Sequence, residues 1–208
     1  MNMLIDKINE IMKKVMTLSM CLLVTLTSLA SGLEHNMSSN FDDKEITLTL
    51  NNVKEGQNLS IKDNYGFVLY KKVFEKSGNA NQKFDLSALP NGTYYFEHEK
   101  DYEIKVIPFH VKSGEVTYDT VNEKIIHKPV VRLTDNKVYL SKLELDKEDV
   151  AVSLYYADDY NEFKVVHTEN FEDTANIQRV YSLSKKNSGN YKMIINANGR
   201  EYIEYFSM

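Results

Sequence analysis

The sequence predicts an all-β protein, built as two tandem Ig-like antiparallel β-sandwich modules after an N-terminal signal peptide. Three observations carry this prediction. An apolar run follows two lysines near the N-terminus. Beyond it, short stretches of alternating apolar and polar residues recur roughly every 8–12 residues with turn residues between them, the pattern of a sandwich. A turn-and-strand motif also occurs twice, which indicates a duplicated module.

The first element is an export signal. Lys13 and Lys14 precede an apolar run over residues 15–29, and the small residues around Ala30 predict signal-peptidase cleavage between Ala30 and Ser31. Residues 1–30 are therefore predicted to be a signal peptide and 31–44 a flexible lead, with either Met1 or Met12 as the start. A membrane anchor is the alternative, but the run is short and contains several hydroxyl groups. We expect an exported protein in the periplasm, at the cell surface or outside the cell, with no membrane span after cleavage.

Cysteine content and charge narrow the function classes. The single cysteine, Cys21, lies inside the signal, so the mature chain has no disulfide and no thiol nucleophile. Residues 1–30 hold three lysines and two acidic residues, which leaves 22 basic and 28 acidic residues in the mature chain. A net charge of −6 without a basic cluster excludes a nucleic-acid partner.

The first module is predicted over residues 45–113. Apolar side chains alternate with polar ones along 46–50, and Gly56 and the segment 63–66 supply turns. The strands expected in this module are 46–50, 59–61, 67–74, 84–89, 93–97 and 104–109.

Residues 114–128 are predicted to be a linker or an edge strand that uses Val116, Tyr118 and Val121. The second module, residues 129–208, repeats the plan, and Asn198-Gly199 is a hairpin turn signal. The strands expected in it are 131–133, 138–143, 150–154, 163–166, 177–183, 191–195 and 203–206.

The repeated motif is interpreted as a fold motif rather than a catalytic one. In both copies a leucine precedes a glycine by six positions, a tyrosine follows two positions later, and a phenylalanine lies 17 positions beyond the glycine. Asn91-Gly92 is a pair suited to positive φ. The motif residues are Leu86, Leu89, Gly92, Tyr94 and Phe109 in the first copy and Leu183, Gly189, Tyr191 and Phe206 in the second.

Asp85–Tyr94 resembles the D-L-S-x-L-x-x-G-x-Y core of the C-terminal sorting domain of the type IX secretion system. That family is a small Ig-like β-sandwich that ends in a hairpin. The chain also resembles short secreted β-sandwich modules common in the Bacteroidota. The stronger match is internal, and the weaker echo at Ser182–Tyr191 lacks the Asp and the Pro. The resemblance implies export, and one hypothesis is a type IX cargo whose C-terminal module is the sorting domain.

No catalytic, cofactor-binding or metal-binding residues are predicted. The five histidines show no i,i+2 or i,i+4 spacing, and the acidic pairs lack the alternating oxygens of a calcium loop. No serine lies in a nucleophile elbow, and no glycine-rich phosphate loop occurs. The protein is therefore predicted not to be an enzyme.

Tyrosine is the unusual component, with 14 residues and no tryptophan. Tyr155, Tyr156 and Tyr160 are a candidate ligand face for a sugar or a peptide, and because neighbours on a strand point to opposite faces, either Tyr155 or Tyr156 should lie outside the core. Thr120 and Thr174 stand in Asp-Thr-Val and Asp-Thr-Ala triplets. These resemble O-glycosylation sites of exported Bacteroidota proteins.

The function predicted from sequence is an exported non-catalytic protein with a structural or binding role. Its partner is expected to be an unidentified protein or a glycan. The alternatives are the type IX cargo described above and a carbohydrate-binding module that uses exposed tyrosines.

Overall fold

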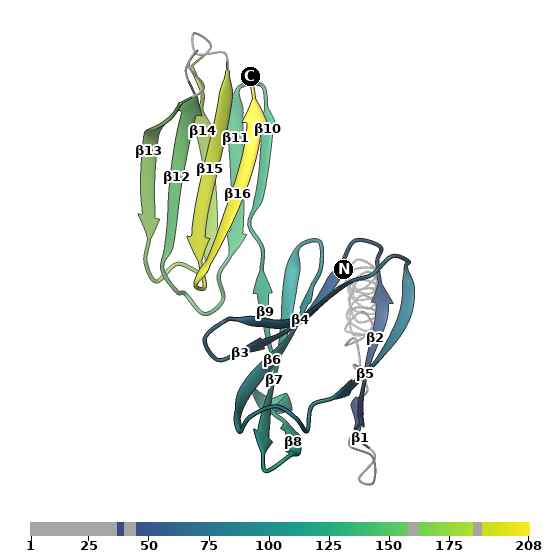
Figure 1. The fold of residues 1–208 in the computed structure, drawn as a ribbon. Helices are drawn as coiled ribbons and strands as arrows, with labels where there is room; N and C mark the ends of the chain where they lie inside the picture. Colours follow the sequence, from purple (N-terminus) through teal and green to yellow (C-terminus); the bar gives the residue numbers. More distant parts are fainter. Residues whose placement is uncertain (1–36, 40–44, 158–161, 185–188) are drawn as a thin grey trace, which may run out of the picture.

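The structure is a computed structural model that describes residues 37–39, 45–157, 162–184 and 189–208. It is a chain of β-strands arranged in two layered bodies, one above the other in Figure 1. The predicted all-β, sandwich-like fold is confirmed. The predicted signal peptide, its cleavage site at Ala30 and Ser31, and Tyr160 lie outside the described residues.

The first sandwich has a three-stranded sheet in the order β1-β2-β5 and a sheet in the order β4-β3-β6-β7-β8. All their pairings are antiparallel. The strands are β1 (Met37–Ser39), β2 (Glu45–Val53), β3 (Asn58–Asp63), β4 (Val68–Val73), β5 (Gly78–Asp85), β6 (Gly92–Glu99), β7 (Glu103–Lys112) and β8 (Glu115–Tyr118).

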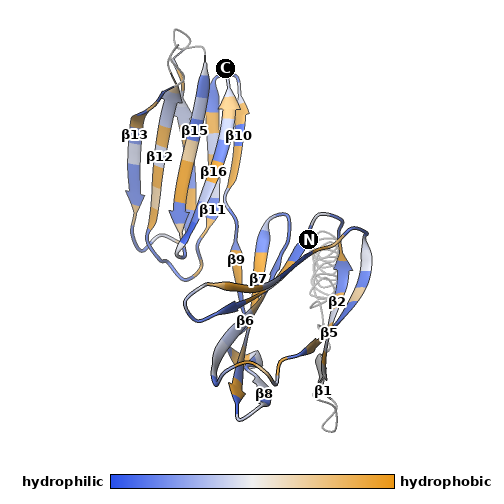
Figure 2. Ribbon diagram, in the orientation of Figure 1, coloured by the Kyte–Doolittle hydropathy of each residue, from blue (hydrophilic) through white to orange (hydrophobic). Residues whose placement is uncertain are grey.

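The second sandwich has sheets in the orders β10-β11-β14 and β13-β12-β15-β16. Its strands are β10 (Val130–Thr134), β11 (Lys137–Leu143), β12 (Val150–Ala157), β13 (Phe163–Phe171), β14 (Asn176–Ser182), β15 (Asn190–Ala197) and β16 (Arg200–Ser207). Figure 2 shows the hydropathy alternation as orange bands between paler and blue ones along β12 and β15. Asn198 and Gly199 both have positive φ, so the predicted hairpin turn between β15 and β16 is confirmed.

The two sandwiches have the same connectivity. If β1 to β7 are matched with β10 to β16, each sheet of the first body has its counterpart in the second. The motif residues occupy equivalent places, since Tyr94 pairs with Phe109 and Tyr191 pairs with Phe206 across neighbouring strands. Both ring pairs are stacked, with centroids 5.4 and 5.8 Å apart. The repeat seen in the sequence is therefore a repeat of structure.

The motif glycines differ in their backbone. The Asn91-Gly92 pair suggested a positive φ, but Gly92 does not have one. The turn is instead closed earlier, by the hydrogen bond from Leu89 N–H to the Leu86 carbonyl, and β6 starts at Gly92 itself. The Tyr94 hydroxyl donates to the Pro90 carbonyl at 2.8 Å. Gly189 has little room, since a Cβ there would lie 3.0 Å from Cε2 of Tyr156.

Each sandwich has its own core. Leu86, Tyr94 and Phe109 belong to the first buried cluster, and Tyr191 belongs to the second, with Leu183 and Phe206 packed against it. Leu89 is half-buried against the first cluster. The two sandwiches thus have separate buried clusters, and the module limits 45–113 and 129–208 stay a prediction.

The segment predicted as a linker or edge strand is held against β7. Its β8 pairs with one half of β7, and β9 (Lys124–His127) pairs with the other half. Between them lies η1 (Thr120–Asn122), a single 3-10 turn whose N-cap Asp119 accepts a bond from Asn122 N–H. Together, β8 and β9 cover the edge of β7 that faces away from β6.

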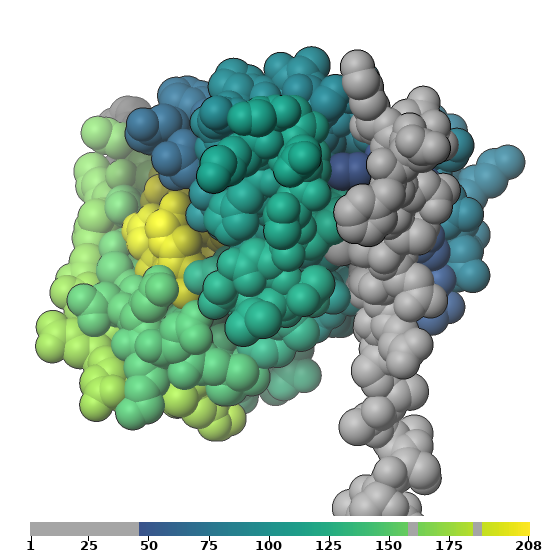
Figure 3. All heavy atoms as spheres, turned by 90° about the horizontal axis from the view of Figure 1, so that it is seen from below, coloured from purple at the N-terminus to yellow at the C-terminus, as the bar shows by residue number. Residues whose placement is uncertain are grey.

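A group of charged residues connects the two bodies, which contact each other in the view from below (Figure 3). Arg200, at the start of β16, donates from Nη2 to the Glu97 carboxylate on β6. Lys62 on β3 contacts the other oxygen of Glu97 at 2.7 Å. Burial raises the pKa of Glu97, but the hydrogen bonds from Arg200 and Lys62 outweigh burial and hold that pKa below its ordinary value.

Candidate binding surface

The outer face of the sheet β13-β12-β15-β16 carries a row of large side chains. On β15, Met193 and Ile195 point into the core, so Lys192 points outward. Tyr155 of β12 lies opposite Lys192 on one side, and Tyr205 of β16 lies opposite it on the other.

Two aromatic rings flank the Lys192 ammonium group, and a third ring packs against one of them. Its Nζ lies 4.7 Å from the ring centroid of Tyr155 and 4.8 Å from that of Phe163 on β13. The Tyr205 and Phe163 rings meet edge to face with centroids 6.1 Å apart. We call Tyr155, Phe163, Lys192 and Tyr205 the aromatic platform. Its lysine is held by cation–π attraction to two rings.

The platform faces solvent. Tyr205 is 67% exposed, while Tyr155, Phe163 and Lys192 are half-buried. Exposed apolar side chains extend it along the edge strands, with Val165 on β13 and Ile203 on β16. A contiguous exposed apolar area of this kind marks an interaction site more often than scattered single residues do.

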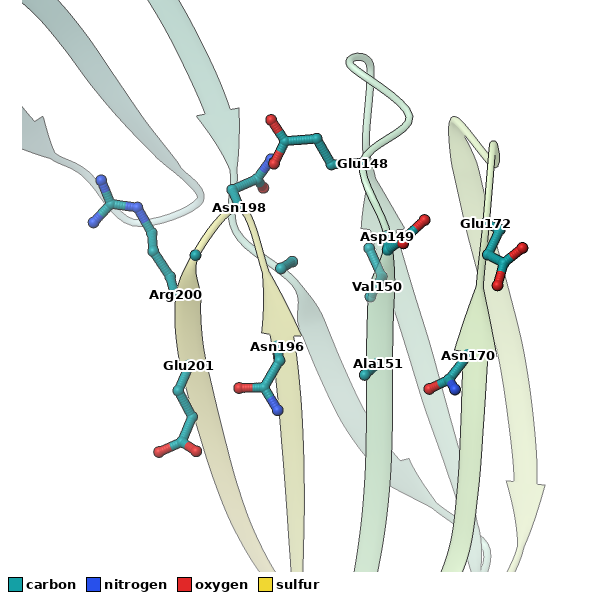
Figure 4. Close-up of a pocket in the computed structure, with 12 residues that line it drawn as sticks. Glu148, Asp149, Val150, Ala151, Asn170, Glu172, Asn196, Asn198, Arg200 and Glu201 are labelled. Atoms are coloured by element: carbon teal, nitrogen blue, oxygen red, sulfur yellow. The ribbon is translucent and has the colours of Figure 1, made fainter.

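A hollow of about 620 Å³ lies at the end of the second sandwich where β12, β13, β15 and β16 meet. Figure 4 shows that its acidic side chains point in different directions. Glu148 turns toward Asn198, which donates to it at 3.2 Å, and Glu201 points away along β16. Among the residues that the structure describes, no group of three or more His, Cys, Asp or Glu is placed to hold a metal ion.

The predicted ligand face is split by the strand. Tyr155 is in the platform, whereas Tyr156 lies on the inner face, 5.0 Å from the Tyr191 ring. Phe163, Lys192 and Tyr205 were not singled out from the sequence. The order of the strands brings them together, because it places β15 between β12 and β16, and local patterns in the sequence do not show that order.

The two threonines of the proposed glycosylation triplets lie in different settings. Thr120 is exposed in η1. Thr174 is half-buried, and its hydroxyl donates to the Glu172 carbonyl at 2.8 Å. Their modification stays a prediction.

Comparison with known proteins links the first sandwich to export. Residues 42–111 match the family model described as a secretion system C-terminal sorting domain, a span that includes β2 to β6 and all of β7 but its last residue. No curated protein matches the chain. In the described part of the chain, no helix is long and apolar enough to cross a membrane.

One similar solved structure is the BSP domain of a biofilm-associated protein, with 10% sequence identity and a TM-score of 0.27. The alignment covers 84% of this chain and 29% of that one, a likeness too low to carry an argument. The family match indicates export to the cell surface or beyond it. The chain is therefore an exported β-sandwich protein whose residues 42–111 are similar to the secretion system C-terminal sorting domain family.

Proposed function

We propose that the protein is a non-catalytic binding protein of the cell surface or its surroundings, which holds a glycan on the aromatic platform. One observation carries this proposal: two aromatic rings flank one ammonium group on a solvent-facing sheet, and a third ring packs against one of the two. A soluble sheet face with no partner usually presents polar side chains in alternation with the buried ones. Around Lys192, the outward positions hold tyrosine, phenylalanine and valine instead.

The chemistry of the platform fits a sugar. The C–H face of a pyranose ring packs on an aromatic face, and its hydroxyl groups accept hydrogen bonds from a nearby cation. Lys192 has three ammonium protons, and its contacts with the Tyr155 and Phe163 rings hold it beside both aromatic faces. The Tyr205 hydroxyl adds a polar group at the exposed rim.

The absence of catalysis is part of the proposal. Acid–base hydrolysis of a glycosidic bond needs two carboxyl groups aimed at one bond. The carboxylates of the Figure 4 hollow diverge, and Glu148 accepts a hydrogen bond from Asn198. These arrangements support a surface that binds without reacting.

The test is binding of the exported chain to a printed panel of neutral and uronic-acid oligosaccharides. Tyr205→Ala and Lys192→Met should each weaken binding by about 5- to 30-fold, the effect of losing roughly 1–2 kcal/mol of stacking or cation contacts. Tyr102→Ala is the matched control because Tyr102 is 69% exposed and lies in the other sandwich. Unchanged binding by the platform variants would reject the proposal.

A second role rests on a different observation, the family match over residues 42–111. We infer that the first sandwich takes part in export by a type IX pathway, in contrast to the hypothesis that assigns sorting to the C-terminal module. Mass analysis of protein from periplasm, outer membrane and medium distinguishes the two. A surface form that ends at Met208 supports the first sandwich, and a surface form that has lost residues 129–208 supports the C-terminal module.

A further inference from the structure

The edge of β16 that faces away from β15 has no strand partner among the described strands. Its counterpart in the first sandwich, β7, is paired along the same edge by β8 and β9. The duplicated fold therefore shows the same edge once covered and once open.

The open edge presents regularly spaced backbone groups. Gly189 and Met208 exchange two hydrogen bonds, at 3.1 and 3.0 Å. Because hydrogen-bonded pairs alternate along an antiparallel ladder, the even-numbered residues of β16 bond to β15. The N–H and C=O groups of Glu201, Ile203 and Tyr205 therefore point outward. The residue of β7 that corresponds to Tyr205 is Pro108, and its outward carbonyl accepts Asp119 N–H at 3.0 Å.

Other long edge strands carry features that discourage strand pairing. Lysine on an edge and β-bulges both do so. The strands β4 and β13 belong to pairs with a register shift, whereas the β15–β16 pairing is regular. The basic residues inside the other edge strands are Lys71 and Lys72 in β4, Lys83 in β5, Arg132 in β10, Lys164 in β13 and Arg179 in β14. In β16 the only basic residue is Arg200 at its start, which is bonded to Glu97.

We propose that β16 pairs antiparallel with β16 of a second copy of the chain, about a two-fold axis at Ile203. This register uses the whole strand and joins outward-facing groups to one another. Ile203 meets Ile203, and Glu201 meets Tyr205. On the inner face Glu204 meets Tyr202, so no glutamate lies directly opposite another.

The pairing joins two four-stranded sheets into one continuous sheet. It places the Ile203 side chains of the two copies side by side and Tyr205 beside Glu201 of the second copy, while the outer face that carries the platform stays open to solvent. The outer faces of the two sheets stay on the same side, because a two-fold axis that relates antiparallel strands is perpendicular to the sheet. The inference does not depend on what the platform binds.

The proposal is tested by light scattering coupled to size-exclusion chromatography of the exported chain. Protein concentrations up to about 100 µM make a dimer detectable even if its dissociation constant is weaker than micromolar. The wild type should have twice the monomer mass. Ile203→Lys and Ile203→Glu should each be monomeric because like charges then meet at the axis. Mixed in equal amounts, the two variants should recover the dimer.

Val165→Lys is the control, since Val165 is 55% exposed on the opposite edge strand of the same sheet. It should dimerise as the wild type does. Far-UV circular dichroism establishes that each variant is folded. A monomeric wild type, a dimeric Ile203→Lys variant, failure of the mixed variants to dimerise, or equal disruption by Val165→Lys would each overturn the proposal.

Discussion

The ion pair between Glu97 and Arg200 makes the connection between the two sandwiches measurable. The Glu97 side chain is 10% exposed and contacts both Arg200 and Lys62. The perturbation is a double-mutant cycle with Glu97→Gln, Arg200→Met and the double variant. Methionine keeps much of the apolar volume of the arginine stem while removing its charge and its donors.

The magnitude follows from burial and from the number of partners. Arg200→Met removes one charge-assisted hydrogen bond, worth about 1.5–3 kcal/mol, and Glu97 keeps Lys62. The Arg200 side chain is 23% exposed, so water compensates in part and we expect a loss of about 2 kcal/mol. The sum of the two single losses in unfolding free energy should exceed the loss in the double variant by about 1–2 kcal/mol, which is the coupling energy expected for residues in contact.

The pH dependence has a definite sign. The folded-state pKa of Glu97 lies below its ordinary value, so the unfolded chain binds the proton more tightly. The contribution of Glu97 to stability is therefore fully present above the unfolded pKa of about 4.3 and is lost as pH falls through the lower folded value. Glu97→Gln should remove this part of the acid sensitivity.

The assay is urea unfolding followed by tyrosine fluorescence, since the chain has no tryptophan. Glu169 and Arg179 serve as the comparison pair, within one sandwich at 2.7 Å and with side chains 28% and 44% exposed. A pair this exposed should couple by less than about 1 kcal/mol. A Glu97–Arg200 coupling energy near zero at neutral pH would show that this ion pair does not stabilise the connection between the two sandwiches.

Three further predictions concern single side chains. Lys142→Met should cost about 3–5 kcal/mol, because it leaves the Glu144 carboxylate, 3% exposed, without its ammonium partner at 2.8 Å; thermal denaturation should show a far smaller loss when Glu144→Leu is added. Tyr94→Phe should cost about 1 kcal/mol, the value of its bond to the Pro90 carbonyl, and Tyr94→Ala about 4 kcal/mol; equal losses in urea unfolding would contradict this. Gly189→Ala should cost about 1–3 kcal/mol through overpacking, because its Cβ would lie 3.0 Å from the Tyr156 ring. Gly92→Ala is the control, since the atom nearest to a Cβ there is 3.6 Å away, and this variant should unfold at nearly the wild-type temperature.

Local patterning predicted many of the strands, since alternation along segments such as 46–50 and 150–154 depends on which face each side chain meets. It was wrong at 84–89, because the strand there is β5, Gly78–Asp85, and residues 86–89 form the turn that follows it. The tyrosine–phenylalanine spacing also identified a cross-strand pair in both copies, because the hairpin between them keeps a constant length. The positive φ suggested by the Asn91-Gly92 pair was wrong for Gly92, because a dipeptide preference does not determine backbone angles where a strand begins.

The candidate site was only partly predictable. Tyr155 was identified from its neighbourhood in the sequence, but Phe163, Lys192 and Tyr205 join it through three strand pairings. A sequence shows which residues lie on one face of a strand, while the order of strands in the sheet depends on the packing of the whole domain. The cover of β7 by β8 and β9 was likewise foreseen only as an edge strand, without its partner.

Glycan binding on the aromatic platform can be located by a two-dimensional NMR titration of the exported chain with the oligosaccharide that binds best in the panel. The largest chemical-shift changes should fall on Tyr155, Phe163, Lys192 and Tyr205, and they should disappear in the Lys192→Met variant. Changes centred on the hollow around Glu148 and Asn198, or unaltered in Lys192→Met, would contradict this prediction.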